Sequence, residues 1–158
     1  MTQGVQTSYE DKMEKGYPGQ ILDLEPKLIR SGFCKVASPG DTIPFGRVVT
    51  RSGEGVKLGE TDPAFGLSVR DLARENDADG NAAYAEGETV GFMQVGFMYC
   101  EIDGTGSAGD ALTYIDGTGQ LSTAAADASH TALNAILEED CATTGDLCKV
   151  RINILANL

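Results

Sequence analysis

Residues 102–119 contain one five-residue phrase twice: Ile102-Asp103-Gly104-Thr105-Gly106 returns thirteen residues later as Ile115-Asp116-Gly117-Thr118-Gly119. An Asp-Gly pair that follows a β-rich run is typical of a tight turn, because glycine adopts positive φ freely and aspartate tolerates it. Two such turns, separated by one strand length, predict an antiparallel meander. The chain is therefore expected to consist of short strands and sharp turns, which its 20 glycines also favour.

The C-terminal end of the chain supports the same reading. Residues 147–154 alternate apolar and polar side chains, as a strand with one buried face does. Residues 135–138 are expected to pair with them across the loop at 140–146. Residues 89–100 are apolar on both faces, which predicts a strand that either is central or changes partners at Gly96.

From residue 33 onward, short β runs and turn residues follow one another at intervals of about ten residues. This spacing is typical of sandwiches and barrels. We predict a mainly β fold, an antiparallel β-sandwich or barrel of jelly-roll-like type, for a body at 33–158. Short helices over residues 67–75 and 127–133 remain the local alternatives to strand and loop.

Residues 1–32 differ in composition and are predicted to form an extended N-terminal arm. A polar stretch precedes a turn at 17–20, and Pro26 then favours extended backbone because it fixes φ and restrains the residue before it. Apolar side chains are dense after this turn, which is unusual for a disordered tail. These side chains are expected to pack on a protein surface. If the arm does not fold back on its own body, that surface belongs to a neighbouring subunit. The expected contact residues are Tyr17, Ile21, Leu22, Leu24, Leu28 and Ile29.

The charge is strongly one-sided. Residues 1–35 carry five basic and five acidic side chains, so the net charge of −12 belongs to residues 36–158. Between Arg74 and Lys149 there is no lysine or arginine but there are fourteen acidic residues. Such a surface repels phosphate, so we expect no nucleic-acid partner. No apolar run is long enough for a membrane span, and the start resembles no signal peptide, so synthesis in a cytoplasm is expected.

Motifs for catalysis are absent from the sequence. The single histidine, His130, could act as the base of a nucleophilic serine, but the sequence contains no Gly-x-Ser-x-Gly motif. No phosphate-binding or dinucleotide-binding motif occurs either. We therefore expect neither an enzyme nor a cofactor. The cysteines Cys34, Cys100, Cys141 and Cys148 include no Cys-x-x-Cys pair, so buried free thiols are favoured over a zinc site.

An acidic loop provides the alternative function, a ligand- or calcium-binding β domain. Asp77, Asp79, Asn81 and Glu88 occupy positions 1, 3, 5 and 12 of an EF-hand-like loop. The sixth position, where a sharp turn needs glycine, is Ala82. A β segment rather than a helix follows, so an acidic surface loop explains the same residues equally well.

Several segments taken in order resemble the capsid cement, or decoration, proteins of tailed bacteriophages. The resemblance covers about residues 17–155 and is densest at Gly109-Asp110-Ala111-Leu112-Thr113-Tyr114 with Gly119-Gln120-Leu121-Ser122-Thr123. The other segments are Gly40-Asp41 with Phe45-Gly46-Arg47-Val48-Val49, then Phe65-Gly66-Leu67-Ser68-Val69-Arg70, and Gly145-Asp146-Leu147-Cys148-Lys149-Val150-Arg151-Ile152. The resemblance assigns no role to the acidic loop at Asp77–Asn81 or to the cysteines.

The resemblance implies a small β body that binds the outside of a phage head and reinforces contacts between capsomers of the major capsid protein. It also implies a homo-oligomer, a dimer or alternatively a trimer. The acidic body favours the outer surface of the virion, because packaged DNA lines the inside. Residues 17–30 would then cross to a neighbour, and removal of residues 1–30 is expected to leave a soluble body.

Overall fold

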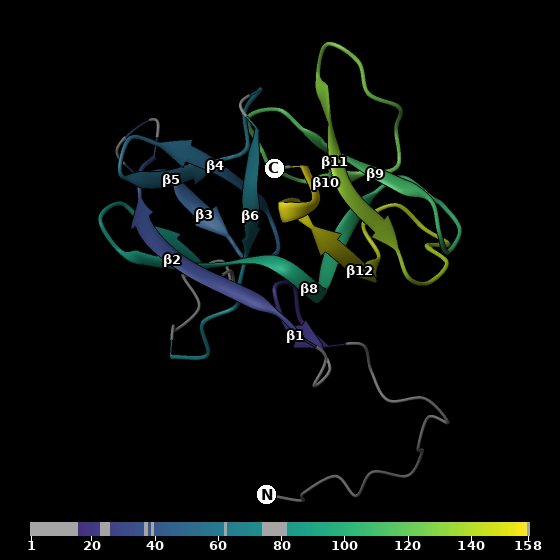
Figure 1. The fold of residues 1–158 in the computed structure, drawn as a ribbon, viewed down its shortest axis with the longest axis horizontal. Coiled ribbons are helices and arrows are strands. Elements are labelled where there is room, and N and C mark those ends of the chain that lie inside the picture. Colours follow the sequence, from purple (N-terminus) through teal and green to yellow (C-terminus); the bar gives the residue numbers. More distant parts are fainter. Residues whose placement is uncertain are drawn as a thin grey trace, which may run out of the picture.

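The computed structural model describes residues 16–22, 26–36, 38, 40–61, 63–73 and 82–157 (Figure 1). Nearly all regular structure among these residues is strand, which confirms the mainly β, barrel-type prediction. The elements are β1 (Ile21–Leu22), β2 (Leu28–Cys34), β3 (Thr42–Pro44), β4 (Val48–Ser52), β5 (Gly55–Leu58), β6 (Ala64–Ser68), β7 (Ala83–Ala85), β8 (Thr89–Asp103), β9 (Ala111–Ile115), β10 (Leu121–Ser122), β11 (His130–Leu137), β12 (Leu147–Asn153) and the 3₁₀ turn η1 (Ile154–Asn157).

Two closed rings of five strands share the long strand β8. Ring 1 runs β8-β2-β5-β4-β6 and returns to β8, whereas ring 2 runs β8-β12-β11-β9-β10 and returns to β8. The first half of β8 belongs to ring 1 and the second half to ring 2, so the rings stand on either side of its midpoint (Figure 1). The pair β3–β7 forms a separate two-stranded sheet.

Each ring contains one parallel pair, which departs from the all-antiparallel expectation. The parallel pairs are β2–β5 in ring 1 and β10–β8 in ring 2. Strand direction must alternate around an all-antiparallel ring, and alternation cannot close on an odd number of strands. A ring of five strands therefore requires a parallel contact, and this chain places one in each ring.

The middle of β8 is the point at which its partners change, one of the two alternatives predicted from the sequence. β2 pairs with β8 from Thr89 to Val95, and β12 pairs with it from Val95 to Glu101. Gly96 has a φ of 140°, and a Cβ there would lie 2.8 Å from the sulfur of Met93. Glycine at this position allows the strand to bend between the two rings.

The core consists of two hydrophobic clusters that correspond to the rings. The first fills ring 1 beneath the β3–β7 sheet: Cys34, Ile43, Phe45, Val49, Val56, Tyr84, Val90 and Phe92. The second fills ring 2 and extends to Val48, Leu67 and Met93. Neighbours Val48 and Val49 thus point into different clusters, because successive side chains of a strand face opposite ways. β4 therefore forms part of the wall between the two cores.

One type of turn starts five of the strands. In each case the fourth residue donates its N–H to the carbonyl of the first, and its side-chain oxygen accepts the N–H of the first. The third residue is a glycine with φ between 75° and 95°, as a type II turn requires. The five turns are residues 17–20, 38–41, 85–88, 107–110 and 143–146. We call them the strand-initiating turns.

The antiparallel meander predicted from the repeated phrase is wrong. β9 and β10 form an antiparallel pair, but β8 and β9 do not pair, because β10 lies between them and runs parallel to β8. The two phrases also differ in conformation: Gly119 has a φ of 64°, whereas its counterpart Gly106 forms an extended bridge with Cys141. Ring closure decides both outcomes.

The described part of residues 1–32 folds back on the chain's own body. β1 pairs with β8 at Met98 and Phe97, and β2 pairs with β8 along almost its whole length. The expected boundary at residue 32 thus falls inside β2. A strand was not expected there, because the partner that completes the pairing lies about sixty residues away in the sequence.

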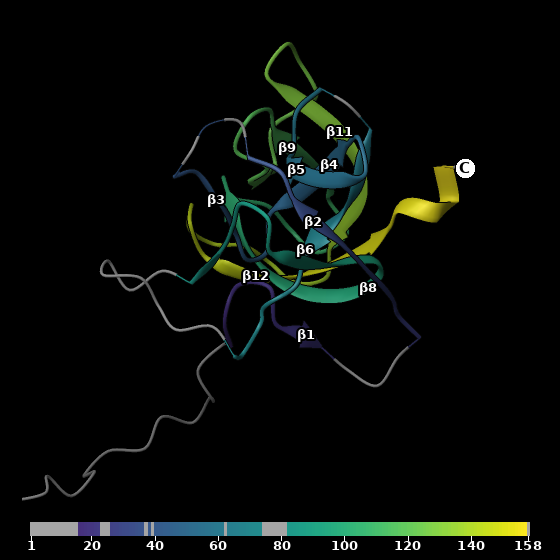
Figure 2. The same ribbon diagram turned by 90° about the vertical axis from the view of Figure 1, so that its left-hand side faces the viewer.

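The short helices considered from the sequence do not form in the described residues. Ala64–Ser68 is strand, the described residues 69–73 contain no helix, and β11 begins at His130. The C-terminal turn η1 continues from β12 at one side of the molecule (Figure 2). No helix in the described part of the chain is long and apolar enough to cross a membrane.

Candidate interaction surface

His130 belongs to a turn rather than to a catalytic triad. Its Nδ1 lies 2.9 Å from Oδ1 of Asp127 and 3.1 Å from Oγ of Ser129. A triad uses two different ring nitrogens for its acid and its nucleophile, whereas here both groups meet the same nitrogen. Oδ1 of Asp127 also accepts the N–H groups of Ser129 and His130. The bond from the Ser129 N–H, followed by those from the side chains of His130 and Ser129, holds the pKa of Asp127 below its usual range. The cluster caps the loop before β11.

Three of the four residues of the calcium alternative, Asp77, Asp79 and Asn81, lie outside the described residues. The fourth, Glu88, closes a strand-initiating turn, and its Oε2 accepts the N–H of Ala85 at 2.6 Å. No group of three or more histidine, cysteine or acidic side chains suited to a metal occurs among residues that the structure describes.

The cysteines are free and buried, as expected from the sequence. Cys100 and Cys148 face each other across β8 and β12. Burial raises the pKa of the Cys100 thiol, which suppresses the reactive thiolate. The Sγ of Cys34 donates to the carbonyl of Tyr84 at 3.7 Å. The described thiols thus serve as small core residues.

The outward face of β2 carries exposed apolar side chains. Ile29 is 40% exposed and Phe33 is 58% exposed, and both lie on one face of the strand because they are four residues apart. β2 pairs with β5 only at its last two residues, so residues 28–32 have no strand partner on that edge among the described residues. An open strand edge beside apolar side chains is a favourable surface for a partner.

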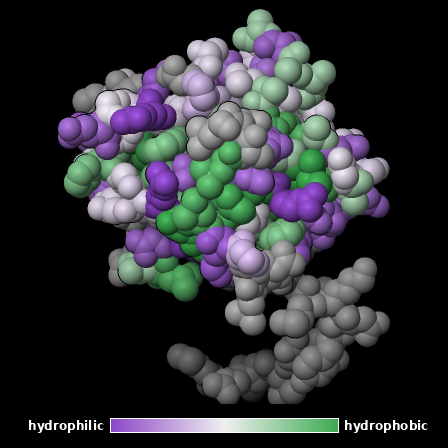
Figure 3. All heavy atoms as spheres, in the orientation of Figure 1, coloured by the Kyte–Doolittle hydropathy of each residue, from purple (hydrophilic) through white to green (hydrophobic). Residues whose placement is uncertain are grey.

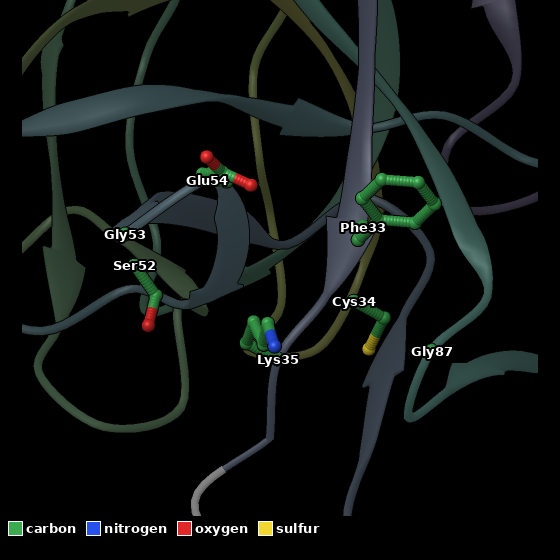
Figure 4. A pocket seen from close by; sticks show the side chains of 7 residues that line it. All are labelled: Phe33, Cys34, Lys35, Ser52, Gly53, Glu54 and Gly87. Carbon is green, nitrogen blue, oxygen red and sulfur yellow. The ribbon is translucent and has the colours of Figure 1, made fainter.

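A shallow hollow of about 500 Å³ adjoins Phe33. In Figure 4 the Glu54 carboxylate lies to the left and the Phe33 ring to the right, and Lys35 lies below both. A Cβ at Gly55 would lie 2.5 Å from the Phe33 carbonyl oxygen, so only glycine allows β5 to approach β2 here. The hollow holds no set of groups for bond-making chemistry, and it suits contact with a protein surface.

The residues predicted to contact a partner divide into two groups. Tyr17, 62% exposed, and Ile29 are accessible. Ile21, Leu22 and Leu28 are half-buried, and Ile21 packs against the ring 2 core. Leu24 lies outside the described residues. The structure brings Ile29 together with Phe33, which sequence reasoning had missed. The alternation of inward and outward side chains along β2 could have revealed Phe33, because a buried Cys34 places its neighbour Phe33 on the outward face.

A second exposed site surrounds Arg70, between β6 and β7. The Arg70 guanidinium lies 4.5 Å from the centroid of the Tyr17 ring, and Leu72 nearby in sequence is 87% exposed. A further hydrophobic area lies near the centre of the face in Figure 3, where Figure 1 draws β6, β8 and η1. Exposed apolar groups thus occur at several places on a strongly acidic body.

Comparison with known proteins identifies the family to which this two-ring body belongs. A family model described as "Structural cement protein (E217 gp24/Pam3 gp6)" matches residues 5–153. The chain belongs to the phage structural cement protein family. The match spans both rings, as the resemblance in sequence suggested. This cement protein is accordingly a structural protein of the phage capsid.

One solved structure supports the fold. A chain in the capsid of Myoviridae phage XM1 is similar to the cement protein with a TM-score of 0.70 at 14% identity. That alignment covers 94% of this chain and 97% of the other. The N base of head fiber gp8.5 in bacteriophage phi29 aligns with a TM-score of 0.45 at 13% identity, over 82% and 96% of the two chains. No curated protein matches.

Proposed function

We propose that this cement protein binds the outer surface of the phage head and stabilises contacts between capsomers of the major capsid protein. The family match over residues 5–153 is the observation that carries the proposal. A protein that binds the assembled shell but not its loose subunits stabilises the shell by mass action. Many copies that each span a seam between capsomers add their contributions.

The charge distribution supports the outer location. Residues 36–158 carry the whole net charge of −12, and such a body is repelled by packaged DNA. The outward face of β2 supplies a contact surface, with Ile29 and Phe33 beside an unpaired strand edge. Tyr17 of the predicted set is accessible as well. A homo-oligomer, a dimer or a trimer, would multiply these contacts through effective concentration.

The experiment uses phage heads that lack this protein. Purified full-length chain is added, and the heads are tested by co-sedimentation and by their resistance to heating. We expect saturable binding and a higher temperature of head disruption. Phe33→Ser should weaken binding about tenfold, because it removes a large apolar contact of the kind that dominates interfaces. Thr118→Ser, a small change in an exposed turn, is the matched control.

Failure of the full-length chain to sediment with heads contradicts the proposal. Binding without a rise in disruption temperature contradicts the stabilising role while it preserves the association. Digestion of decorated intact heads with a protease too large to enter tests the location. Protection of the cement protein under those conditions would place it inside the shell and contradict the outer-surface assignment.

A further inference from the structure

The Arg70 side chain belongs to a stack that runs from the ring 1 core to the surface. Buried Tyr84 and Phe45 contact edge to face, with ring centroids 5.3 Å apart and planes at 79°. The Arg70 guanidinium lies 5.5 Å from the centroid of the Phe45 ring and 4.5 Å from that of Tyr17. Cation–π contacts of this geometry hold a guanidinium in one orientation.

The backbone fixes the same arrangement. Arg70 donates its N–H to the Gly19 carbonyl at 2.8 Å, and Gly19 donates to the Tyr99 carbonyl at 2.8 Å. Gly19 has a φ of 75°, and a Cβ there would lie 2.8 Å from the Arg70 nitrogen. The strand-initiating turn that carries Tyr17 is therefore locked against Arg70, so both side chains are positioned before any partner arrives.

Arg70 has no acceptor in the described part of the chain. Its Nε is buried and makes no hydrogen bond, and no carboxylate of the described residues pairs with its guanidinium. Arg47 and Arg151, in contrast, pair with Glu101 and Glu138. Leaving the buried Nε–H donor without an acceptor costs free energy.

We propose that Tyr17, Arg70 and Leu72 form a docking site for a segment of the capsid shell that presents a carboxylate beside an apolar side chain. The proposal rests on the proposed function and names the chemistry of the partner. A carboxylate is the group that a planar guanidinium binds through two parallel hydrogen bonds. Exposed Tyr17 and Leu72 supply the adjoining apolar contact, and tyrosine and arginine dominate the energetics of interfaces.

The charge of the molecule favours the shell over a second copy as the occupant. Two copies that met here would bring together bodies that each carry a net charge of −12. Like charge at close range opposes association at this polar site, whereas the homo-oligomer proposed above can meet through the apolar outward face of β2. A shell segment needs only one carboxylate at the point of contact, so the shell is the occupant to which we commit.

The test titrates heads that lack this protein with full-length variants and measures the apparent dissociation constant by co-sedimentation. Arg70→Lys keeps the charge but loses the planar fork and the stacking, so we expect binding at least tenfold weaker. Arg151→Lys is the matched control, because Arg151 already pairs with Glu138, and a change below twofold is expected. Tyr17→Phe should bind as the original chain does, and Tyr17→Ala should bind weakly.

The outcomes separate this site from the proposed function. If the original chain binds heads and Arg70→Lys binds equally well, the docking site is wrong and the proposed function stands. If the original chain does not bind, both are wrong. A dimer in solution that Arg70→Lys converts to monomer would make a second copy the occupant and overturn the proposal. If Arg70→Lys unfolds, Leu72→Ser at an exposed position decides, with weaker binding expected.

Discussion

Gly109 and Gly119 both have positive φ, 95° and 64°, but they differ in what surrounds them. A Cβ at Gly109 would meet nothing within 4 Å, whereas one at Gly119 would collide with the backbone of Val48 and approach that of Gly59. Gly119 accepts the Val48 N–H at its carbonyl, and Gly117 donates to the Gly59 carbonyl. The second Ile-Asp-Gly-Thr-Gly phrase therefore docks on the segments that enter β4 and leave β5, and so joins ring 2 to ring 1.

We expect Gly109→Ala to lower the free energy of unfolding by about 1–2 kcal/mol, the cost of left-handed backbone for a residue with a Cβ. Gly119→Ala should cost about 3 kcal/mol or more, because overpacking against fixed backbone adds to the same strain. Urea unfolding monitored by circular dichroism measures both. Equal losses would show that Gly119 makes no tight contact between the rings.

The side chains that close the strand-initiating turns act as acceptors of one N–H group. Oδ2 of Asp110 accepts from Ser107 at 2.8 Å, and the amide Oε1 of Gln20 serves the same role for Tyr17 at 2.9 Å. Asp110→Asn should thus change the free energy of unfolding by less than about 0.5 kcal/mol, and Asp110→Ala should cost about 1 kcal/mol. If the asparagine variant loses as much as the alanine variant, charge rather than the acceptor stabilises the turn.

At the scale of elements, local patterns predicted strands better than pairings. The β11–β12 hairpin was expected because its strands are close in the sequence, and Ala135 indeed pairs with Ile152. β2 was divided between an arm and a body, because the partner that buries it lies far along the chain. Of the candidate contact residues, the sequence predicted Tyr17 and Ile29, whose side chains are exposed, but not Phe33 or Arg70, and the contact role of all four stays a prediction. The exposure of Phe33 and the stacking of Arg70 depend on tertiary neighbours.

Removal of residues 1–30 is now expected to unfold the protein instead of leaving a soluble body. The truncation deletes β1 and the first three residues of β2, which pair with β8 in ring 1. Removal of residues 1–15 deletes no described strand and is the matched control. Thermal unfolding followed by circular dichroism should show a cooperative transition only for the shorter truncation. A folded product lacking residues 1–30 would show that ring 1 closes without β1 and the first three residues of β2.

At the scale of the molecule, the two rings are coupled through β8, the wall around Val48 and Leu67, and the Gly119 contact. We expect them to unfold in one transition, since neither core is complete without the shared strand. Hydrogen exchange is the measurement: Gly119→Ala, a change in ring 2, should lower the protection of the β2 and β5 amides in ring 1. Unchanged protection there would indicate that the rings are independent units.

The sequence by itself determined the class of the fold, the places where strands begin and the charge of the surface. These are local properties: side-chain alternation, glycine at positive φ and an acceptor three residues after the start of a turn. Only the tertiary structure decided which strands meet, because pairing depends on contacts between distant residues. The repeated Ile-Asp-Gly-Thr-Gly phrase shows the division: one sequence takes two conformations, since Gly106 must bridge to Cys141 and Gly119 must fit against Val48.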